Sequence, residues 1–184
     1  FYPTSGGQMH DQGSLNGEEV VEIFKQGKYL IHKLKQKPSF KVGELVEGHI
    51  DFDYRKQLTQ HHSSTHLINA AAKKVLGNHI NQAGAKKTLE KAHIDITHYQ
   101  SLTREELDHI EQEANTLIKS CIPIHKSFIE RTQAEKEYGV GIYQGGVVPG
   151  KKLRIVNIVG VDVEACGGTH LNNTSEAELI KIIK

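Results

Sequence analysis

The chain has 184 residues, of which 37% are hydrophobic, so it is long and apolar enough to bury a core as one domain or as two closely packed subdomains. Its formal charge of +1, with twelve histidines counted as neutral, is too small to indicate nucleic-acid binding by itself. No basic stretch leads into a long apolar run, so the sequence predicts no signal peptide and no membrane span. Because the chain begins at Phe1 rather than at a methionine, we expect a soluble, non-membrane piece of a longer protein.

Residues 1–57 are predicted to form a β-rich subdomain. In front of the first strand, Ser5-Gly6-Gly7-Gln8 reads as a turn in which the missing side chains of two glycines would let backbone amides approach a ligand closely. Short β-prone runs follow, separated by Gly17, Gly27 and the segment 38–43. These runs are Val20–Phe24, Tyr29–His32 and Leu45–Ile50. Their spacing suits a small antiparallel barrel or meander.

From Thr59 to Leu76 the hydrophobic period becomes helical, with Thr59 placed to cap the start and Gly77 just past the end. The apolar stripe contains Ile68, Ala71, Ala72, Val75 and Leu76. His62 and His66 are four residues apart, so their rings share one face of the predicted helix, as chelation of a metal ion requires. No glutamate follows His62, so the His-Glu-x-x-His pattern of metalloproteases is absent.

The second half alternates strands with shorter helices. Ile94–His98 alternates apolar and polar residues like a half-buried strand, and Thr103 with Glu106 forms a capping box that opens a helix ending before Pro123. Cys121 continues the apolar face of this helix and is predicted to be a small core residue. Further strands are predicted at 124–130, 153–159, 161–165 and 179–183, with a short helix over 132–138 and, over 141–150, a glycine-rich loop without a P-loop pattern. The prediction is an α+β fold, in which a small β-barrel-like subdomain (1–57) packs on a domain of antiparallel sheet and helices (58–184).

Cys166 and His170 form a second pair with the same spacing as His62 and His66. The two pairs together supply one thiolate and three imidazoles, which is the donor set and the ligand number of a tetrahedral zinc site. We therefore predict that these four residues bind one zinc ion, and on spacing alone a purely structural zinc site is an equal alternative. With one of its two cysteines assigned to a metal, the chain does not indicate a disulfide scaffold, and a reducing, cytoplasmic compartment is expected.

With these pairs and strands placed, the sequence resembles the editing domain of alanyl-tRNA synthetase, which is shared with the free-standing AlaX deacylases and, more distantly, with threonyl-tRNA synthetase. The matching stretches occur in the family order and cover nearly the whole chain. They are Ser5–Gln8, His62–Leu67, Leu76–Gln82, Ile94–His98 and Glu164–His170. The sequence around Tyr143-Gln144-Gly145-Gly146 and Asp162–Ala165 looks closer to archaeal synthetases than to bacterial ones. One departure is Gln60, where many relatives have an arginine.

The resemblance implies hydrolysis of the ester that joins a wrong amino acid, serine or glycine, to alanine tRNA. It places the zinc ligands at His62, His66, Cys166 and His170, the pocket glutamine at Gln82, and the double-glycine segment at Gly6, Gly7 and Gln8. The implied partners are the acceptor end of tRNA(Ala) and the other domains of a parent synthetase, and a homodimer of the full-length protein is left open. No nucleotide is expected in this piece, since ATP would serve only the absent activating domain.

Two versions of the chemistry are compatible with the four ligands. Either a zinc with a displaceable ligand activates water, or a zinc held by all four ligands only positions the substrate, and the sequence shows no protein general base in either case. Serine differs from alanine by one hydroxyl, and a pocket that needs this hydroxyl can discriminate by about 10⁴ or more. The candidates for recognising the serine hydroxyl are Gln82, Thr65 and Thr169, although both threonines could instead bond to local backbone.

Two alternatives to a synthetase editing domain stay open. One is a free-standing AlaX-type deacylase, and the other is a zinc-stapled RNA-binding module without catalysis. Contacts with RNA would have to come from local patches because the net charge is small. The candidate patches are Lys73-Lys74, Lys86-Lys87 and Lys151-Lys152, although paired lysines are more commonly a solvated face.

Overall fold

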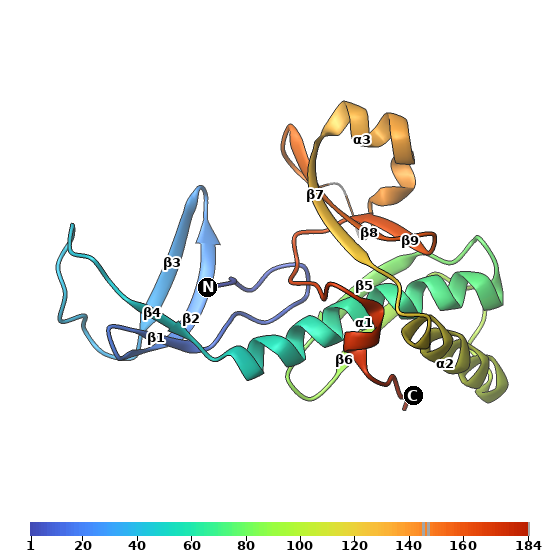
Figure 1. Cartoon of the computed structure of the whole chain (residues 1–184), viewed down its shortest axis with the longest axis horizontal. Coiled ribbons are helices and arrows are strands. Elements are labelled where there is room, and N and C mark those ends of the chain that lie inside the picture. Colours follow the sequence, from blue (N-terminus) through green and yellow to red (C-terminus); the bar gives the residue numbers. More distant parts are fainter. Residues whose placement is uncertain (145, 147, 184) are drawn as a thin grey trace.

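The computed structural model describes residues 1–144, 146 and 148–183 (Figure 1). Three residues lie outside the described residues: Gly145, Val147 and Lys184. The first two belong to the predicted glycine-rich loop, and Lys184 is the last residue of the predicted 58–184 domain. Within the described part, no helix combines the length and the apolar character needed to cross a membrane.

The chain forms three antiparallel sheets and three α-helices within the described residues. The strands are β1 Gly13–Leu15, β2 Glu18–Gln26, β3 Tyr29–Leu34, β4 Gly48–Ile50, β5 Gln82–Lys87, β6 Ala92–Ile96, β7 Ile124–Glu130, β8 Lys152–Ile158 and β9 Asp162–Ala165. The helices are α1 Phe52–Leu76, α2 Arg104–Lys119 and α3 Arg131–Tyr138, with 3₁₀ turns at Val140–Ile142 and Thr174–Ala177. The predicted α+β class is confirmed.

The N-terminal sheet has the order β3-β2-β1-β4 and lies beyond the start of α1 (Figure 1). In the described residues β3 and β4 are its two edges, so the barrel-like closure expected for residues 1–57 is not confirmed. The other sheets are the hairpin β5-β6 and the three-stranded sheet β7-β8-β9. The predicted boundary at residue 57 falls inside α1, and the division of the chain into two domains stays a prediction.

Helix α1 begins seven residues before the predicted start at Thr59. Asp51 is the N-cap, and its carboxylate accepts a 2.9 Å hydrogen bond from the Tyr54 amide. The first turns bury the apolar side chains of Tyr54 and Leu58, and they also make polar contacts with the N-terminal segment. Arg55 donates from Nε to the buried Asp11 carboxylate at 2.9 Å, and the same carboxylate accepts from the Tyr2 amide. The predicted start at Thr59 misses this part of the helix, although Asp51 offers a local cap signal for it.

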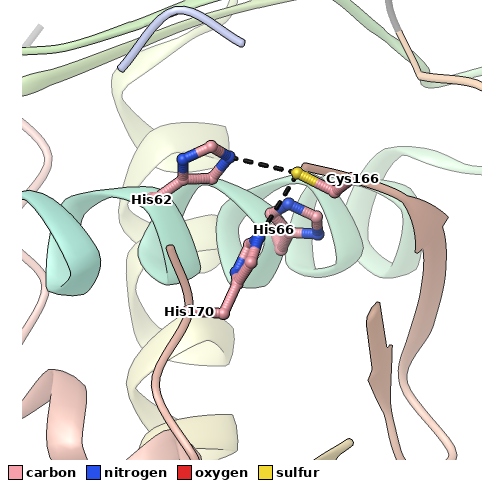
Figure 2. Close-up of side chains that lie close together, drawn as sticks. All are labelled: His62, His66, Cys166 and His170. Carbon is pink, nitrogen blue, oxygen red and sulfur yellow. Dashed lines mark hydrogen bonds between the residues drawn. The ribbon is translucent and has the colours of Figure 1, made fainter. Parts of the chain in front are cut away.

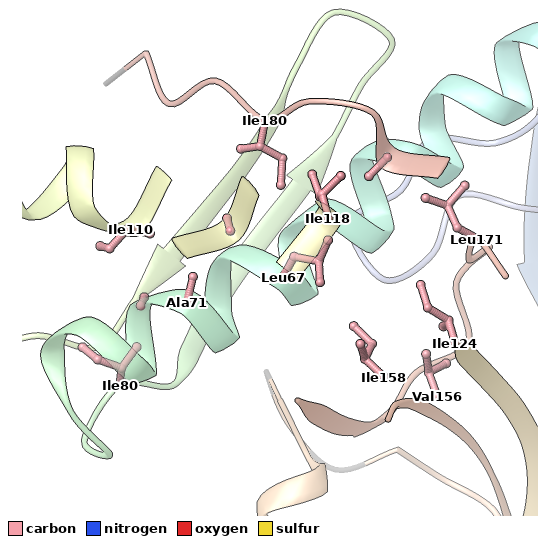
Figure 3. Packing of buried hydrophobic residues seen from close by; sticks show 13 residues of the cluster. Leu67, Ala71, Ile80, Ile110, Ile118, Ile124, Val156, Ile158, Leu171 and Ile180 are labelled. Atoms are coloured by element: carbon pink, nitrogen blue, oxygen red, sulfur yellow. The ribbon is translucent and has the colours of Figure 1, made fainter. Parts of the chain in front are cut away.

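The main core lies where α1 packs against α2, with β7, β8 and the carboxyl-terminal segment adding to it (Figure 3). Its buried side chains include Leu67, Ala71, Ile80, Ile110, Ile118, Ile124, Val156, Ile158, Leu171 and Ile180. The capping box predicted for α2 is present, with Thr103 and Glu106 each bonding to the other's backbone amide. A second cluster packs α3 onto the other face of β8. Its members include Ala134, Leu153 and Ile155.

The predicted strand over 179–183 is wrong, because the segment pairs with no strand in the described residues and runs along α2 instead. Side chains of α2 satisfy its backbone. Asn115 accepts from the Ile180 amide at 3.0 Å and donates to the Ile180 carbonyl at 2.8 Å, while Glu111 accepts from the Ile182 amide at 2.6 Å. Helix side chains thus replace the ladder that a strand would need.

Cys121 is exposed, so its prediction as a core residue is also wrong. Helix α2 ends at Lys119 with Ser120 as its C-cap, so it stops two residues before Cys121 and does not place that residue on its apolar face. Cys121 then adopts a left-handed backbone with φ of 50°, which turns it away from the apolar face of the helix.

Candidate metal centre

The four predicted zinc ligands come together from two distant parts of the chain (Figure 2). His62 and His66 lie one turn apart on α1, and Cys166 and His170 lie in the turn that follows β9. One ligand atom from each residue lies within 4.8 Å of all the others. The Cys166 Sγ is 3.3 Å from the Nε2 atoms of both His62 and His170. The arrangement offers one sulfur and three ring nitrogens to a common point.

His62 is oriented by Gln8. The His62 Nδ1 lies 2.7 Å from Gln8 Oε1, and because an amide oxygen only accepts, the ring proton sits on Nδ1 and the Nε2 lone pair faces the sulfur of Cys166. Gln8 is fully buried, and Thr169 fixes its amide. The Thr169 amide donates to Oε1 at 3.2 Å, and Gln8 Nε2 donates to Thr169 Oγ1 at 2.8 Å.

His66 is oriented by two carboxylates of β9. Its Nδ1 lies 3.2 Å from Asp162 and 3.2 Å from Glu164, which leaves Nε2 for a metal ion. Asn69, also buried, donates to Glu164 at 3.3 Å. An imidazole that binds a metal through one nitrogen and a carboxylate through the other is the common pattern of histidine metal ligands, because the carboxylate fixes the tautomer and raises the basicity of the ligand.

His170 is oriented by the hydroxyl of Ser63. The distance from Ser63 Oγ to His170 Nδ1 is 3.4 Å, and the same oxygen accepts from the Leu171 amide at 3.0 Å. All three imidazoles therefore have an oxygen partner at Nδ1 and leave Nε2 for the shared centre. Ser63, which could have been a simple helix hydroxyl, contributes to the metal centre instead.

Burial and charge set the protonation of the cluster. Burial, followed by the neighbouring cations, holds the pKa of His62 and of His170 well below its usual value, so both rings are neutral, as metal ligands must be. Burial would also lower the pKa of His66, but Glu164 and Asp162 hold it well above the usual value. Burial raises the pKa of Glu164 to about 7. For Cys166, burial favours the thiol, yet the nearby His66 lowers the pKa and favours the thiolate.

The turn after β9 is shaped to the His62 ring. A Cβ at Gly168 would overlap the His62 ring, whereas one at Gly167 would meet no heavy atom within 4 Å. Arg154 of β8 holds this turn by donating from Nη1 to the carbonyls of Cys166 and Gly168 at 2.8 and 2.9 Å. The missing side chain of Gly168 is thus what allows α1 and the turn to approach.

The double-glycine turn docks on β5 beside the centre. Gly6 and Gly7 have positive φ, and a Cβ on Gly7 would overlap the Ala85 carbonyl. The Lys87 amide donates to the Gly7 carbonyl at 2.7 Å, and the Lys87 ammonium, which is buried, donates to the Gly6 carbonyl at 3.1 Å. Lys87 was a candidate for contact with phosphate, and this prediction is wrong because the turn covers its side chain.

Of the other predicted substrate-binding residues, Thr65 and Thr169 bond to groups of the centre and Gln82 does not within the described residues. Thr65 is buried on α1 and donates to the His62 carbonyl at 2.7 Å. Thr169 bonds to Gln8 and accepts from Thr59 at 2.7 Å. Gln82 is on β5, and its side chain makes no hydrogen bond with the four ligands in the described part of the chain. Their roles in binding a substrate stay predictions.

Sequence reasoning missed Asp162 and Glu164 as partners of His66. A signal was present, because the two residues alternate on β9 just before Cys166 and alternate residues of a strand share a face. Gln8 was predicted to bind substrate, and no local pattern indicated that it would contact His62.

The donor set fits a zinc ion. One thiolate and three imidazoles match the ligands that zinc prefers, and the oxygen partners at each Nδ1 supply the outer contacts that such sites have. His62, His66, Cys166 and His170 would hold the ion.

Comparison with protein families agrees with the resemblance seen in the motifs. A family model described as the threonyl and alanyl tRNA synthetase second additional domain matches residues 153–184, which contain Cys166 and His170. The whole chain is also similar to curated alanine–tRNA ligases of archaea. It is 47% identical to that of Methanococcus maripaludis strain C7, 51% identical to that of Methanocella arvoryzae and 47% identical to that of Metallosphaera sedula, and each match covers 100% of this chain and 21% of the relative. The chain therefore spans about a fifth of the length of these relatives.

Proposed function

We propose that this chain, a relative of one segment of the archaeal alanine–tRNA ligases over its whole length, is an editing domain that hydrolyses mischarged tRNA(Ala). Its substrates would be the seryl and glycyl esters of that tRNA, and its place of action would be the cytoplasm. The observation that carries the proposal is the convergence of His62, His66, Cys166 and His170 on one point, with an oxygen partner at the Nδ1 of each ring.

The chemistry would combine a metal ion with the preorganised side chains around it. A bound zinc ion supplies a Lewis acid that polarises the ester carbonyl and lowers the pKa of a coordinated water. Gln8, Ser63 and the carboxylates of Asp162 and Glu164 keep the three imidazoles aligned, so no reorganisation is needed when a substrate arrives. Both versions of the chemistry, the one in which a ligand is displaced and the one in which the ion only positions the ester, require the bound ion.

Discrimination between serine and alanine would depend on polar groups that need the serine hydroxyl. A pocket of this kind rejects alanine because its polar groups would be left unpaired. Thr65 and Thr169 already bond to protein groups, so they would have to exchange a partner to read the hydroxyl. Gln82 has no side-chain hydrogen bond within the described residues and is therefore the simplest candidate.

The test is release of serine from seryl-tRNA(Ala), with alanyl-tRNA(Ala) as the unreactive comparison. Cys166→Ala should reduce release to the uncatalysed rate, whereas Cys121→Ala should leave the rate unchanged because Cys121 is exposed and lies beyond α2. Removal of metal by a chelator should abolish release, and zinc should restore it. Full activity in the metal-free protein would sink the proposal. Binding of the tRNA without any release would instead support a non-catalytic zinc-stapled module.

A further inference from the structure

The charge of the chain is unevenly distributed. The segment 24–41, which we call the basic hairpin, contains six lysines and no acidic residue, so it carries +6 and leaves −5 for the rest of a chain whose net charge is +1. The lysines are Lys25, Lys28, Lys33, Lys35, Lys37 and Lys41, and all six are exposed. The small net charge of the chain therefore conceals a strongly basic segment.

Within the described residues, carboxylates neutralise only two of these lysines. Lys33 lies 3.5 Å from Glu22, and Lys35 lies 2.7 Å from Glu19. The remaining four lysines have no ion-pair partner in the described part of the chain. Tyr29, at the tip of the hairpin, is 63% exposed, and the Lys28 ammonium lies 5.5 Å from its ring centre. Exposed lysines beside an exposed aromatic ring form a surface suited to nucleic acid.

The position of the basic hairpin also favours a nucleic-acid partner. Strands β2 and β3 and the loop after them project beyond the start of α1, away from α2 and from the sheet β7-β8-β9 (Figure 1). The start of α1 is about 15 Å along the helix axis from His62. A tRNA whose terminal ester entered the metal centre would have its paired stem some distance away, where phosphate groups could meet the lysines.

We propose that the basic hairpin binds the phosphate backbone of the tRNA acceptor stem. This inference rests on the proposed function, since it assumes that the esterified end of the same RNA enters the metal centre. Lysine contacts with phosphate release counterions, so the binding should weaken steeply with salt and should not depend on base sequence.

The experiment measures binding of an unacylated acceptor-stem RNA hairpin to the full chain by fluorescence anisotropy over a range of salt concentrations. A triple variant of the basic hairpin, Lys25→Gln, Lys28→Gln and Lys37→Gln, is compared with a triple control, Lys91→Gln, Lys119→Gln and Lys136→Gln. All six lysines are exposed and lack ion pairs within the described residues, so both variants remove the same charge. The basic-hairpin variant should lower the slope of log K against log salt by about one per lysine, and the control should keep the slope of the original chain.

Three results would overturn the proposal. They are an unchanged slope in the basic-hairpin variant, an equal loss in the control variant, and binding of the original chain to phosphatidylserine vesicles but not to RNA. Serine release is measured separately on the same proteins. If the chain binds RNA through these lysines but releases no serine, the proposed hydrolysis fails and the binding surface stands. If it releases serine but its RNA binding does not depend on these lysines, the proposed hydrolysis stands and the binding surface fails.

Discussion

At the scale of single residues, the metal centre depends on how closely two backbones approach. Helix α1 brings His62 to the turn after β9, and the turn can lie against the ring because Gly168 has no side chain. The neighbouring Gly167 faces open space. Neither residue has the left-handed φ that favours glycine, so the available space alone distinguishes the two positions.

Gly168→Ala should therefore displace the His62 ring and lower the affinity for zinc, whereas Gly167→Ala should bind zinc as the original chain does. The expected loss is at least about tenfold, the lower end of what misaligned ligands cost. Competition with a chromophoric chelator measures it, and the cobalt spectrum of each variant reports the ligand geometry. Equal affinities in the two variants would show that the turn can move without disturbing the centre.

At the scale of elements, the carboxyl-terminal segment is held by the side chains of a helix. Asn115 and Glu111 of α2 satisfy the backbone of residues 180–182, and Glu111 also pairs with Lys181 at 2.7 Å. The Lys181 side chain, which is the main cause, lowers the pKa of Glu111. Because the folded-state pKa is lowered, this stabilisation is present at neutral pH and is lost as the pH falls through the lowered value.

Glu111→Gln should loosen this segment and leave the rest of the fold intact. The neutral side chain forms a weaker hydrogen bond to the Ile182 amide and no ion pair. The free energy of local opening should therefore fall by about 1 kcal/mol, which makes amide exchange about fivefold faster. Hydrogen exchange of residues 180–182 at neutral pH measures this. Glu113→Gln is the matched control, since Glu113 pairs with Lys74 and makes no hydrogen bond to the segment within the described residues. Similar exchange in both variants would contradict the assigned role of Glu111.

At the scale of the whole molecule, the metal centre joins three regions that are distant in sequence. Gln8 comes from the amino-terminal segment, His62 and His66 from α1, and Cys166 and His170 from the turn after β9. The amino-terminal segment is tied to α1 by the ion pair between the buried Asp11 and the half-buried Arg55, and to β5 by the double-glycine turn. The amino-terminal region thus belongs to the centre although it contributes none of the four predicted ligands.

Gln8→Ala should lower zinc affinity by about 10- to 100-fold, the range found when the outer partner of a histidine ligand is removed. The physical reason is that the His62 tautomer and ring orientation would no longer be fixed. Isothermal titration with zinc measures the effect, and urea unfolding of the metal-free protein shows whether the variant is still folded. Gln133→Ala on α3, where the side chain is exposed, is the control. Unchanged zinc affinity in a folded Gln8→Ala protein would show that Gln8 does not orient His62 for metal binding.

Local signals were sufficient for several features. The paired spacing in His62-Ser63-Ser64-Thr65-His66 and Cys166-Gly167-Gly168-Thr169-His170 predicted a common centre, and the structure brings these residues together. The capping box of α2 and the strands over β7, β8 and β9 were also predicted, because their periodicity and cap chemistry involve neighbours in sequence. The predicted resemblance to alanyl-tRNA synthetase is confirmed by the archaeal relatives.

Other features depended on partners far away in the chain. The sequence alone determined which residues could ligate a metal, since ligand type and spacing are local properties. Only the tertiary structure decided that Gln8 orients His62, that Asp162 and Glu164 orient His66, and that residues 179–183 run along α2 instead of forming a strand. In each case the deciding hydrogen bond joins groups separated by dozens of residues, and no periodic pattern within one segment contains that information.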